Sequence, residues 1–427
     1  MKKNLMKAGI IGIASLVIIA GCTSKEPDTA APTTPTETPN TVSEPASNQT
    51  PWVATKNTTR INTNDPTEAA VLVSQTLWTS TNEQNRPGAV ILVNPDDWPI
   101  AAVSANLVHF PNNGPLLFTG KNEIPEITLN EIKRLNPTGA QENQGIQVIL
   151  VGEFDNQVQE QLETLGFKTD HLQASSPADY GKVIDTYYAK AANEIPQSVV
   201  IGSMDSPEFT LPAVKWISHM SEPLLLVSKD EVPQETVDAL QTRNGKANIY
   251  LLGPDTVVSS AVEEQLKQYG KVTRISGNDA YENAIAFAQF KDSETQFGWG
   301  ITKPGHNLSF IPSGSAGLAL AAAPFSHLGK HAPMLWTDND KMPASVMDYV
   351  MSIQPKFELT PSDGPFNHAW LTGAIESFTF DAQAEIDDML EIVSATGEGH
   401  GGHGAGGGNQ AEGTDKKGQP ADHNKHH

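Results

Sequence analysis

The chain of 427 residues contains a single cysteine, Cys22. A disulfide needs two thiols, so no intramolecular disulfide can stabilise the fold. The body must therefore be held together by apolar packing, hydrogen bonds and ion pairs. Because Cys22 has no structural partner to serve, its position near the N-terminus is itself informative.

Long apolar runs are missing as well. The run from Ala8 to Ala20 is shorter than the ~20 residues that a membrane-spanning helix needs. It does have the length of the apolar core of a signal peptide, and Lys2, Lys3 and Lys7 supply the positive segment that precedes such a core. No other segment reaches transmembrane length.

The end of this run, Ile19-Ala20-Gly21-Cys22, resembles the lipobox of bacterial lipoproteins. Its small residues allow the backbone to enter a peptidase cleft, and its thiol is the nucleophile that takes the lipid. We therefore expect residues 1–21 to be a lipoprotein signal peptide. We expect Cys22 to be the lipid attachment site that holds the protein on the extracytoplasmic face of the cell membrane. The alternative is an ordinary signal peptide that happens to contain a cysteine.

Positive charge is also scarce. The chain has 28 Lys and Arg against 50 Asp and Glu, which gives a net charge of −22, and no cluster of basic residues appears. Phosphate binding needs concentrated positive charge, so we expect no nucleic-acid partner. The acidic balance suits a secreted surface but identifies no ligand.

Two segments of biased composition flank the body. Residues 22–57 are rich in Thr, Pro, Ser, Glu and Ala and predict a disordered linker. Residues 394–427 predict a disordered Gly- and His-rich tail. Its imidazoles are candidates for weak, labile binding of a divalent metal, because a glycine-rich chain imposes no ligand geometry. They are His400, His403, His423, His426 and His427.

The body between these segments alternates short apolar runs with amphipathic helical patterns. Val90–Val93, Pro115–Phe118 and Val148–Val151 are continuous apolar runs, as expected of strands that are buried on both faces. Helical periodicity lies between them. This alternation predicts an α/β protein with parallel sheets that are covered by helices on both sides.

An internal repeat divides the body. The segment Thr59–Asp65 returns as Thr273–Asp279, and both copies lead into an alanine-rich helix. Arg60 and Arg274 are 214 residues apart (274 − 60), which is twice 107, and a weaker copy, His171–Pro177, stands near the midpoint. We therefore predict three modules, which comprise residues 58–168, 169–272 and 273–393.

Two further landmarks recur once in each module. A proline-led apolar strand appears as Gly114–Thr119, Glu222–Ser228 and Ala332–Thr337. A strand that ends in glycine appears at Gly152, Gly253 and Gly373. Any one match is weak evidence, whereas three ordered sets in one chain are strong evidence for a repeat.

The units resemble the second type of cell-wall-binding repeat, which occurs in surface proteins of Gram-positive bacteria, usually in sets of three. The segments that match this pattern best are Thr273–Ala288 and Leu318–Asp340. The resemblance covers residues 58 to about 393. It implies three Rossmann-like modules in a pseudo-threefold arrangement and noncovalent binding to an anionic cell-wall polymer.

The chain departs from the family pattern at the aspartate that opens the alanine-rich helix. Trp98, Phe209 and Leu318 stand at this place in the three copies, and all three are apolar. We expect these side chains to be largely buried against neighbouring helices or modules. The opening arginine of the family is also absent from the middle copy.

Two pairs of residues and three glycines are candidates for ligand binding. Arg60 with Asp65, and Arg274 with Asp279, predict anion-binding clefts at helix N-termini. The alternative is that each aspartate caps its helix and the arginine pairs with it structurally. The three strand-ending glycines Gly152, Gly253 and Gly373 stand where open α/β sheets bind ligands, or else form tight strand–helix turns.

No feature of the sequence makes a positive case for catalysis. There is no Gly-x-Ser-x-Gly motif, no second cysteine and no compact pair of carboxylates. His306, His327, His331 and His368 lack the spacing of metal ligands, and we expect most of them in turns or on the surface. No cofactor is indicated.

These observations predict a non-enzymatic, lipid-anchored envelope protein that binds or scaffolds against cell-wall polymer through three repeat modules. The rival interpretation is a solute-binding lipoprotein of an importer, which is also lipidated, acidic and α/β. Three equal repeats argue against it, because that architecture has two lobes around one cleft. An enzyme comes third.

The third module lacks a strand that the other two possess. Segments equivalent to Lys168–Gln173 and Lys271–Ser276 follow the first two modules, but the chain enters the tail after Ile392. The segment Asn57–Ile61 at the other end of the body is equivalent. A sheet without its last strand exposes unpaired backbone groups, so we expect Asn57–Ile61 to join the third sheet and close the modules into a ring. Pairing within the first module is the alternative.

Overall fold

A computed structural model describes residues 50–328 and 331–396. These residues belong to one compact unit, Ala46–His427. Cys22, the expected signal peptide and the histidines of the tail lie outside the described residues. Within them, no helix is both long and apolar enough to cross a membrane.

Module 1 contains a four-stranded sheet in the order β4-β3-β5-β6, and every pair is parallel. Its strands are β3 (Val90–Val93), β4 (Leu116–Phe118), β5 (Val148–Val151) and β6 (Thr169–Leu172). The first three are buried along their whole length, as the continuous apolar runs predicted. The predicted α/β class with parallel sheets in separate modules is confirmed.

Module 2 repeats this order. Its sheet runs β8-β7-β9-β10, again with parallel pairs throughout. The strands are β7 (Ser198–Ser203), β8 (Leu224–Val227), β9 (Ala247–Leu252) and β10 (Gly270–Ile275). In both modules the fourth strand is contributed by the segment that opens the next repeat.

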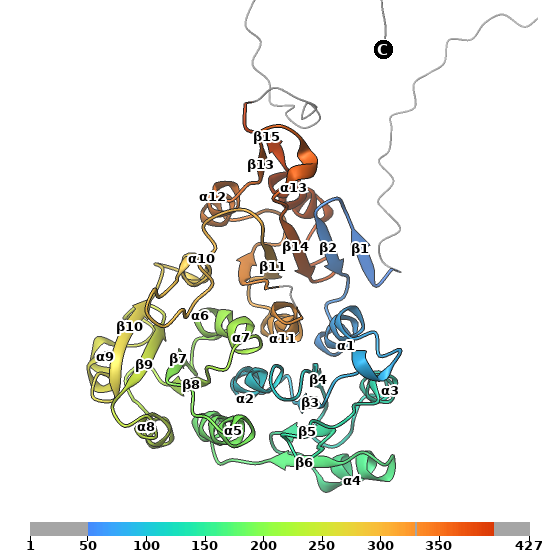
Figure 1. The fold of residues 1–427 in the computed structure, drawn as a ribbon, viewed down its shortest axis with the longest axis vertical. Helices are drawn as coiled ribbons and strands as arrows, with labels where there is room; N and C mark the ends of the chain where they lie inside the picture. The colour runs from blue at the N-terminus through green and yellow to red at the C-terminus, as the bar shows by residue number, and fades with distance from the viewer. Residues whose placement is uncertain (1–49, 329–330, 397–427) are drawn as a thin grey trace, which may run out of the picture. The chain divides into compact units, whose positions relative to one another are not determined.

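Module 3 obtains its fourth strand from the N-terminal end of the body. Its sheet runs β12-β11-β14-β2-β1, and Figure 1 shows the blue strand β2 beside the brown strand β14. The strands are β1 (Trp52–Ala54), β2 (Thr58–Ile61), β11 (Asn307–Pro312), β12 (Met334–Thr337) and β14 (His368–Thr372). A separate two-stranded sheet pairs β13 (Lys356–Phe357) with β15 (Val393–Ser394).

The pairing of β2 with β14 confirms the predicted ring closure. The two strands are parallel, and Thr59 lies opposite Trp370. The Ala369 amide donates to the Asn57 carbonyl at 2.9 Å, and the Gly373 amide donates to the Ile61 carbonyl at 3.1 Å. The sequence placed Trp52–Ala54 in the linker, but these residues form β1, which pairs antiparallel with β2 and covers its outer edge.

Helices flank the sheets of each module (Figure 1). The helices of module 1 are α1 (Pro66–Leu77), α2 (Trp98–Ser104), α3 (Glu126–Leu135) and α4 (Asn156–Thr164), with 3-10 helices η2 (Glu83–Asn85) and η3 (Ala105–Leu107). Those of module 2 are α5 (Pro177–Ala192), α6 (Pro207–Thr210), α7 (Pro212–Ile217), α8 (Gln234–Gln241) and α9 (Ser260–Leu266). Those of module 3 are α10 (Ala280–Gln289), α11 (Ala316–Ala321), α12 (Ala344–Ser352) and α13 (Phe380–Leu390), with η4 (Ala323–Ser326) and η5 (Pro361–Asp363).

Each opening strand and the helix after it connect two modules. β6 completes the sheet of module 1, while α5 packs on β8 and α8 of module 2. β10 and α10 connect modules 2 and 3 in the same way, and β2 and α1 connect modules 3 and 1. The largest apolar cluster consequently contains residues of all three modules.

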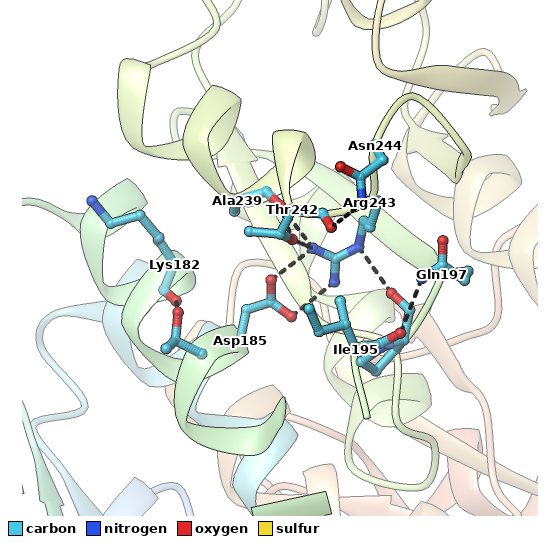
Figure 2. Close-up of polar contacts among 10 residues, drawn as sticks. Lys182, Asp185, Ile195, Gln197, Ala239, Thr242, Arg243 and Asn244 are labelled. Carbon is cyan, nitrogen blue, oxygen red and sulfur yellow. Dashed lines mark hydrogen bonds and ion pairs between the residues drawn. The ribbon is translucent and has the colours of Figure 1, made fainter. Parts of the chain in front are cut away.

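A buried ion pair fixes α8 against α5 inside module 2. Both terminal nitrogens of Arg243 donate to the carboxylate of Asp185 at 2.8 Å, and its Nε donates to the Pro196 carbonyl at 2.9 Å (Figure 2). The side chains of Arg243 and Asp185 are 0% and 7% exposed. Such a pair stabilises the fold only while both partners are present, because either charge alone would be buried without compensation.

We therefore expect Asp185→Ala to lower the free energy of unfolding by ~3–5 kcal/mol in urea denaturation. Lys182→Ala is the control on the same helix, since Lys182 pairs with Asp179 near the surface. It should cost less than about 1 kcal/mol. Equal effects of the two substitutions would show that the buried pair has no special weight.

Candidate functional site

The three glycines singled out by the sequence end equivalent strands. Gly152 follows β5, Gly253 follows β9 and Gly373 follows β14. Their φ angles are 131°, 101° and 149°, a region that side chains with a β-carbon rarely adopt. Each therefore turns the chain at the carboxyl end of a sheet, where open α/β folds bind ligands.

The carbonyl of each glycine accepts a hydrogen bond from the neighbouring fourth strand. Arg60 Nη1 donates to Gly373 at 3.0 Å, and Arg274 Nη1 donates to Gly253 at 2.7 Å. In module 1 the ring nitrogen Nε2 of His171 lies 2.9 Å from the Gly152 carbonyl. His171 thus stands where the other copies have an arginine.

The remaining donors of Arg60 are used within the protein, whereas Nη2 of Arg274 is buried and has no hydrogen-bond partner within the described residues. Arg60 Nε donates to Gln383 Oε1 at 2.8 Å, and its Nη1 donates to the Phe378 carbonyl at 2.6 Å. Burial lowers the pKa of Arg60 to about 10, because the charged form is removed from water. Arg274 Nε donates to Glu263 at 2.8 Å.

Asp65 and Asp279 act as N-caps. The Asp65 carboxylate accepts from the amides of Thr67 and Glu68 at 2.7 and 3.0 Å, and Asp279 accepts from the amide of Glu282 at 2.8 Å. These are the bonds that the capping interpretation predicted. The arginines bind strand-end carbonyls instead of these aspartates. Ligand binding by the two Arg–Asp pairs stays a prediction.

The middle copy of the motif differs at the cap as well. Ser176 caps α5, where its hydroxyl accepts from the Asp179 amide at 3.2 Å. The strand β6 and the N-cap of α5, which form the middle copy of the opening motif, therefore carry neither the arginine nor the aspartate of the other two copies. This copy borders a cavity of about 280 Å³ at the carboxyl ends of β3 and β5, which we call the module 1 crevice.

The module 1 crevice has polar walls. It is lined by Asn94, Asp97, Lys121, Glu153, Ser175, Ser176 and Tyr180, together with Gly152 and four further residues. Lys121 Nζ lies 3.4 Å from Glu153 Oε2 at the rim. Burial, and then the charge of Glu153, raises the pKa of Asp97. The hydroxyl of Tyr180, a residue that is 2% exposed, makes no hydrogen bond of normal geometry within the described residues, although the Ala174 backbone lies near it.

Apolar side chains lie against the equivalent glycines of the other modules. A β-carbon at Gly253 would lie 3.2 Å from Val257 and 3.8 Å from Phe209, and one at Gly373 would lie 3.0 Å from Pro312. Leu318 is 4% exposed, so its predicted burial is confirmed. Trp98 and Phe209 are partly buried and pack against apolar core clusters, so neither is solvent-exposed.

A larger hollow of about 540 Å³ lies between α1 and α3. Ile127, which is 40% exposed, is part of its wall. This hollow is an open groove away from the strand ends, whereas the module 1 crevice lies where backbone groups and helix N-termini converge. We therefore regard the module 1 crevice as the candidate site.

One cluster of histidines was not predicted from the sequence. We expected most of the module 3 histidines in turns or on the surface, but His327 is 7% exposed and lies near His109 and His219 of the other modules. Within the described residues, no group of three or more His, Cys, Asp or Glu is arranged to hold a metal ion. The positions His109, His219 and His327 recur at nearly the repeat spacing, which is the signal that was available.

Comparison with known proteins finds only distant similarities. No family model matches the chain. The amidase enhancer of Bacillus subtilis (strain 168) is 24% identical over 222 residues, which are 50% of this chain and 27% of that protein. The chain therefore spans about a quarter of the length of this curated relative.

Two solved structures share the fold. Cwp6 from Clostridium difficile matches with a TM-score of 0.63 and 18% identity, over 78% of this chain and 47% of Cwp6. Cwp8 from the same organism matches with a TM-score of 0.59 and 16% identity, over 78% of this chain and 52% of Cwp8. The matched share of this chain is large enough to include most of the three modules.

We expect Arg60→Met to lower the free energy of unfolding by about 3 kcal/mol, because it leaves several buried acceptors without a donor at ~1–3 kcal/mol each. Arg274→Met should cost less, since the Arg274 side chain is 17% exposed. Urea unfolding measures both. If Arg60→Met kept its stability but lost ligand binding, the arginine would bind the ligand and not stabilise the fold.

Proposed function

We propose that this chain is a non-enzymatic, lipid-anchored protein of the extracytoplasmic face of the cell membrane, and that it binds cell-wall polymer through its repeat modules. Three observations support this proposal. The repeats resemble a cell-wall-binding family, the fold is that of Cwp6 and Cwp8, and the curated relative is named as an enhancer of an amidase and not as an amidase.

The single observation that carries the proposal is the module 1 crevice. Its walls offer both hydrogen-bond donors and hydrogen-bond acceptors. Its volume of about 280 Å³ suits one sugar unit of a polymer. The ends of the crevice remain open to a longer chain, because Ser175 and Glu153 at its rim are exposed.

The charges of the crevice bear on the chemistry of the ligand. The sequence resemblance implied an anionic polymer, which Lys121 and the N-terminus of α5 would attract. Asp97 and Glu153 act against a phosphate in the same cavity. We therefore infer that a neutral, hydroxyl-rich unit of the wall polymer occupies the crevice, while anionic groups of the polymer stay outside it.

The rival function is solute binding for an importer, which would use the same crevice for a free sugar or amino acid. The two functions can be distinguished by whether purified cell walls retain the protein. Sedimentation with purified cell walls supports wall binding. A thermal shift with a free solute, without retention by walls, would favour the importer.

Tyr180→Phe tests the crevice most directly. It removes one buried hydroxyl and keeps the ring, so the affinity for cell walls should fall about threefold to tenfold, which corresponds to the ~0.5–1.5 kcal/mol of one net hydrogen bond. The stability of the free protein should not fall, because the hydroxyl has no strong partner to lose.

Tyr187→Phe on the same helix is the matched control. The Tyr187 hydroxyl donates to Asn143 Oδ1 at 2.7 Å, outside the crevice. This variant should lose stability and keep its affinity for walls. Unchanged wall binding in both Tyr180→Phe and Lys121→Ala would show that the ligand binds elsewhere.

The anchor has a separate test, since Cys22 lies outside the described residues. Cys22→Ala should abolish the incorporation of a palmitate analogue, because the chain has no second thiol. Wild-type protein and the control variant Ser24→Ala should both be labelled. Label that persists in Cys22→Ala would refute lipid attachment at this residue. Weak metal binding by the tail histidines likewise stays a prediction.

A further inference from the structure

Three equivalent short helices meet where the modules contact one another. α7 of module 2 contacts both η3 of module 1 and η4 of module 3. A histidine follows each of these helices by one or two residues. These histidines are His109, His219 and His327.

The imidazole rings lie close together across the module boundaries. The ring centre of His109 is 5.0 Å from that of His327 and 6.1 Å from that of His219. His331, which follows η4 in the chain, lies with its ring centre 4.2 Å from that of His219. We call these four residues the junction histidines.

Aromatic rings and neutral polar groups surround the junction histidines. Trp299 stacks on His219 with ring centres 6.1 Å apart, and Trp78 lies 6.2 Å from His327. His327 Nε2 lies 2.7 Å from Asn113 Oδ1. Within the described residues, His109 Nδ1 is buried and has no hydrogen-bond partner.

The charged groups of the junction do not compensate a charge on these rings. The ammonium of Lys215, which is fully buried, donates to the Ala322 carbonyl, and Glu222 accepts from Trp216 Nε1 at 3.2 Å. Burial lowers the pKa of Lys215 and raises that of Glu222, because it disfavours the charged form of each group. His306 interacts electrostatically with the cluster through its neighbour His331. In the described part of the chain, no ion pair joins a junction histidine to a carboxylate.

We propose that the rings of His109, His219 and His327 make the contact between the three modules acid-labile, so that the modules stay packed while these imidazoles are neutral and separate at the junction when they are protonated. Each module supplies at least one of the rings, so their mutual repulsion acts across every boundary at once. Among the described residues, no carboxylate forms an ion pair that would hold one of these rings in place once it is protonated.

The direction of the pH dependence follows from the pKa values. Burial, and then the neighbouring histidines, lower the pKa of His219 to about 4 and that of His327 to about 3, from the ordinary 6.5. The stabilisation is complete above pH 6.5, where both states are neutral. It is lost as the pH falls from 6.5 towards 4 and 3, because only the unfolded or opened state then binds protons.

The test is urea unfolding of the full chain carrying Cys22→Ser between pH 7.5 and 4.5, for the parent and for His219→Gln and His327→Gln. Between pH 6 and 5, each buried histidine should raise the unfolding constant about tenfold per pH unit, through the uptake of one proton. Each substitution should therefore reduce the slope of the logarithm of this constant by about one. If His219→Gln does not fold, His109→Gln takes its place.

His171→Gln is the control, since His171 lies in module 1 away from the junction. It should keep the parent slope. Hydrogen exchange at pH 5, compared with pH 7.5 after correction for intrinsic rates, should show loss of protection in α2, α7 and η4 before the central strands β3 and β7. Equal slopes in parent and variants would overturn the proposal. Slopes that change without early exchange at the junction would also overturn it, because protons would then act on global unfolding alone.

Discussion

The pairing of β2 with β14 is the contact on which the rest of the architecture depends. Modules 1 and 2 each receive their fourth strand from the segment that follows them, whereas in module 3 the strand β2 from the start of the body takes this place. β2 supplies that strand, and it also brings Arg60 to the Gly373 carbonyl and places α1 against α11. One parallel pair of strands thus completes a sheet, supplies a hydrogen-bond donor to the carbonyl at a turn, and joins the first module to the last.

The candidate site lies beside the copy of the opening motif that differs most from the other two. The backbone turns at a glycine three times, and each time a side chain on the adjacent strand donates to the glycine carbonyl. In two copies this donor is an arginine, whose guanidinium also binds other groups of the protein. His171 makes the same bond with a shorter side chain, and the uncharged Ser176 replaces an aspartate cap. The copy that looked weakest in the sequence is therefore the one beside the crevice.

Much of the fold could be predicted from the sequence because its signals are periodic. Continuous apolar runs such as Val90–Val93 indicate strands that are buried on both faces. The spacing of Arg60 and Arg274 revealed the modules. Closure followed from a missing strand and the cost of an open edge. The junction histidines could not be predicted in the same way, because their proximity depends on how three modules pack and not on local pattern. The partial exposure of Trp98 and Phe209, and the strand Trp52–Ala54, also depend on tertiary contacts that no local rule contains.

The long separation between β2 and β14 determines the order in which the body can be completed. A chain that emerges from its N-terminus can finish the first sheet when β6 appears and the second when β10 appears, since both need only nearby segments. The third sheet must wait for β14 and then take back a strand made about 310 residues earlier, as the contact between Arg60 and Gly373 shows. Until then the edge of β2 that pairs with β14 has no partner, although β1 can already cover the opposite edge. A nascent chain cut short before β14 would therefore contain two finished modules and one exposed strand that is able to pair with another molecule.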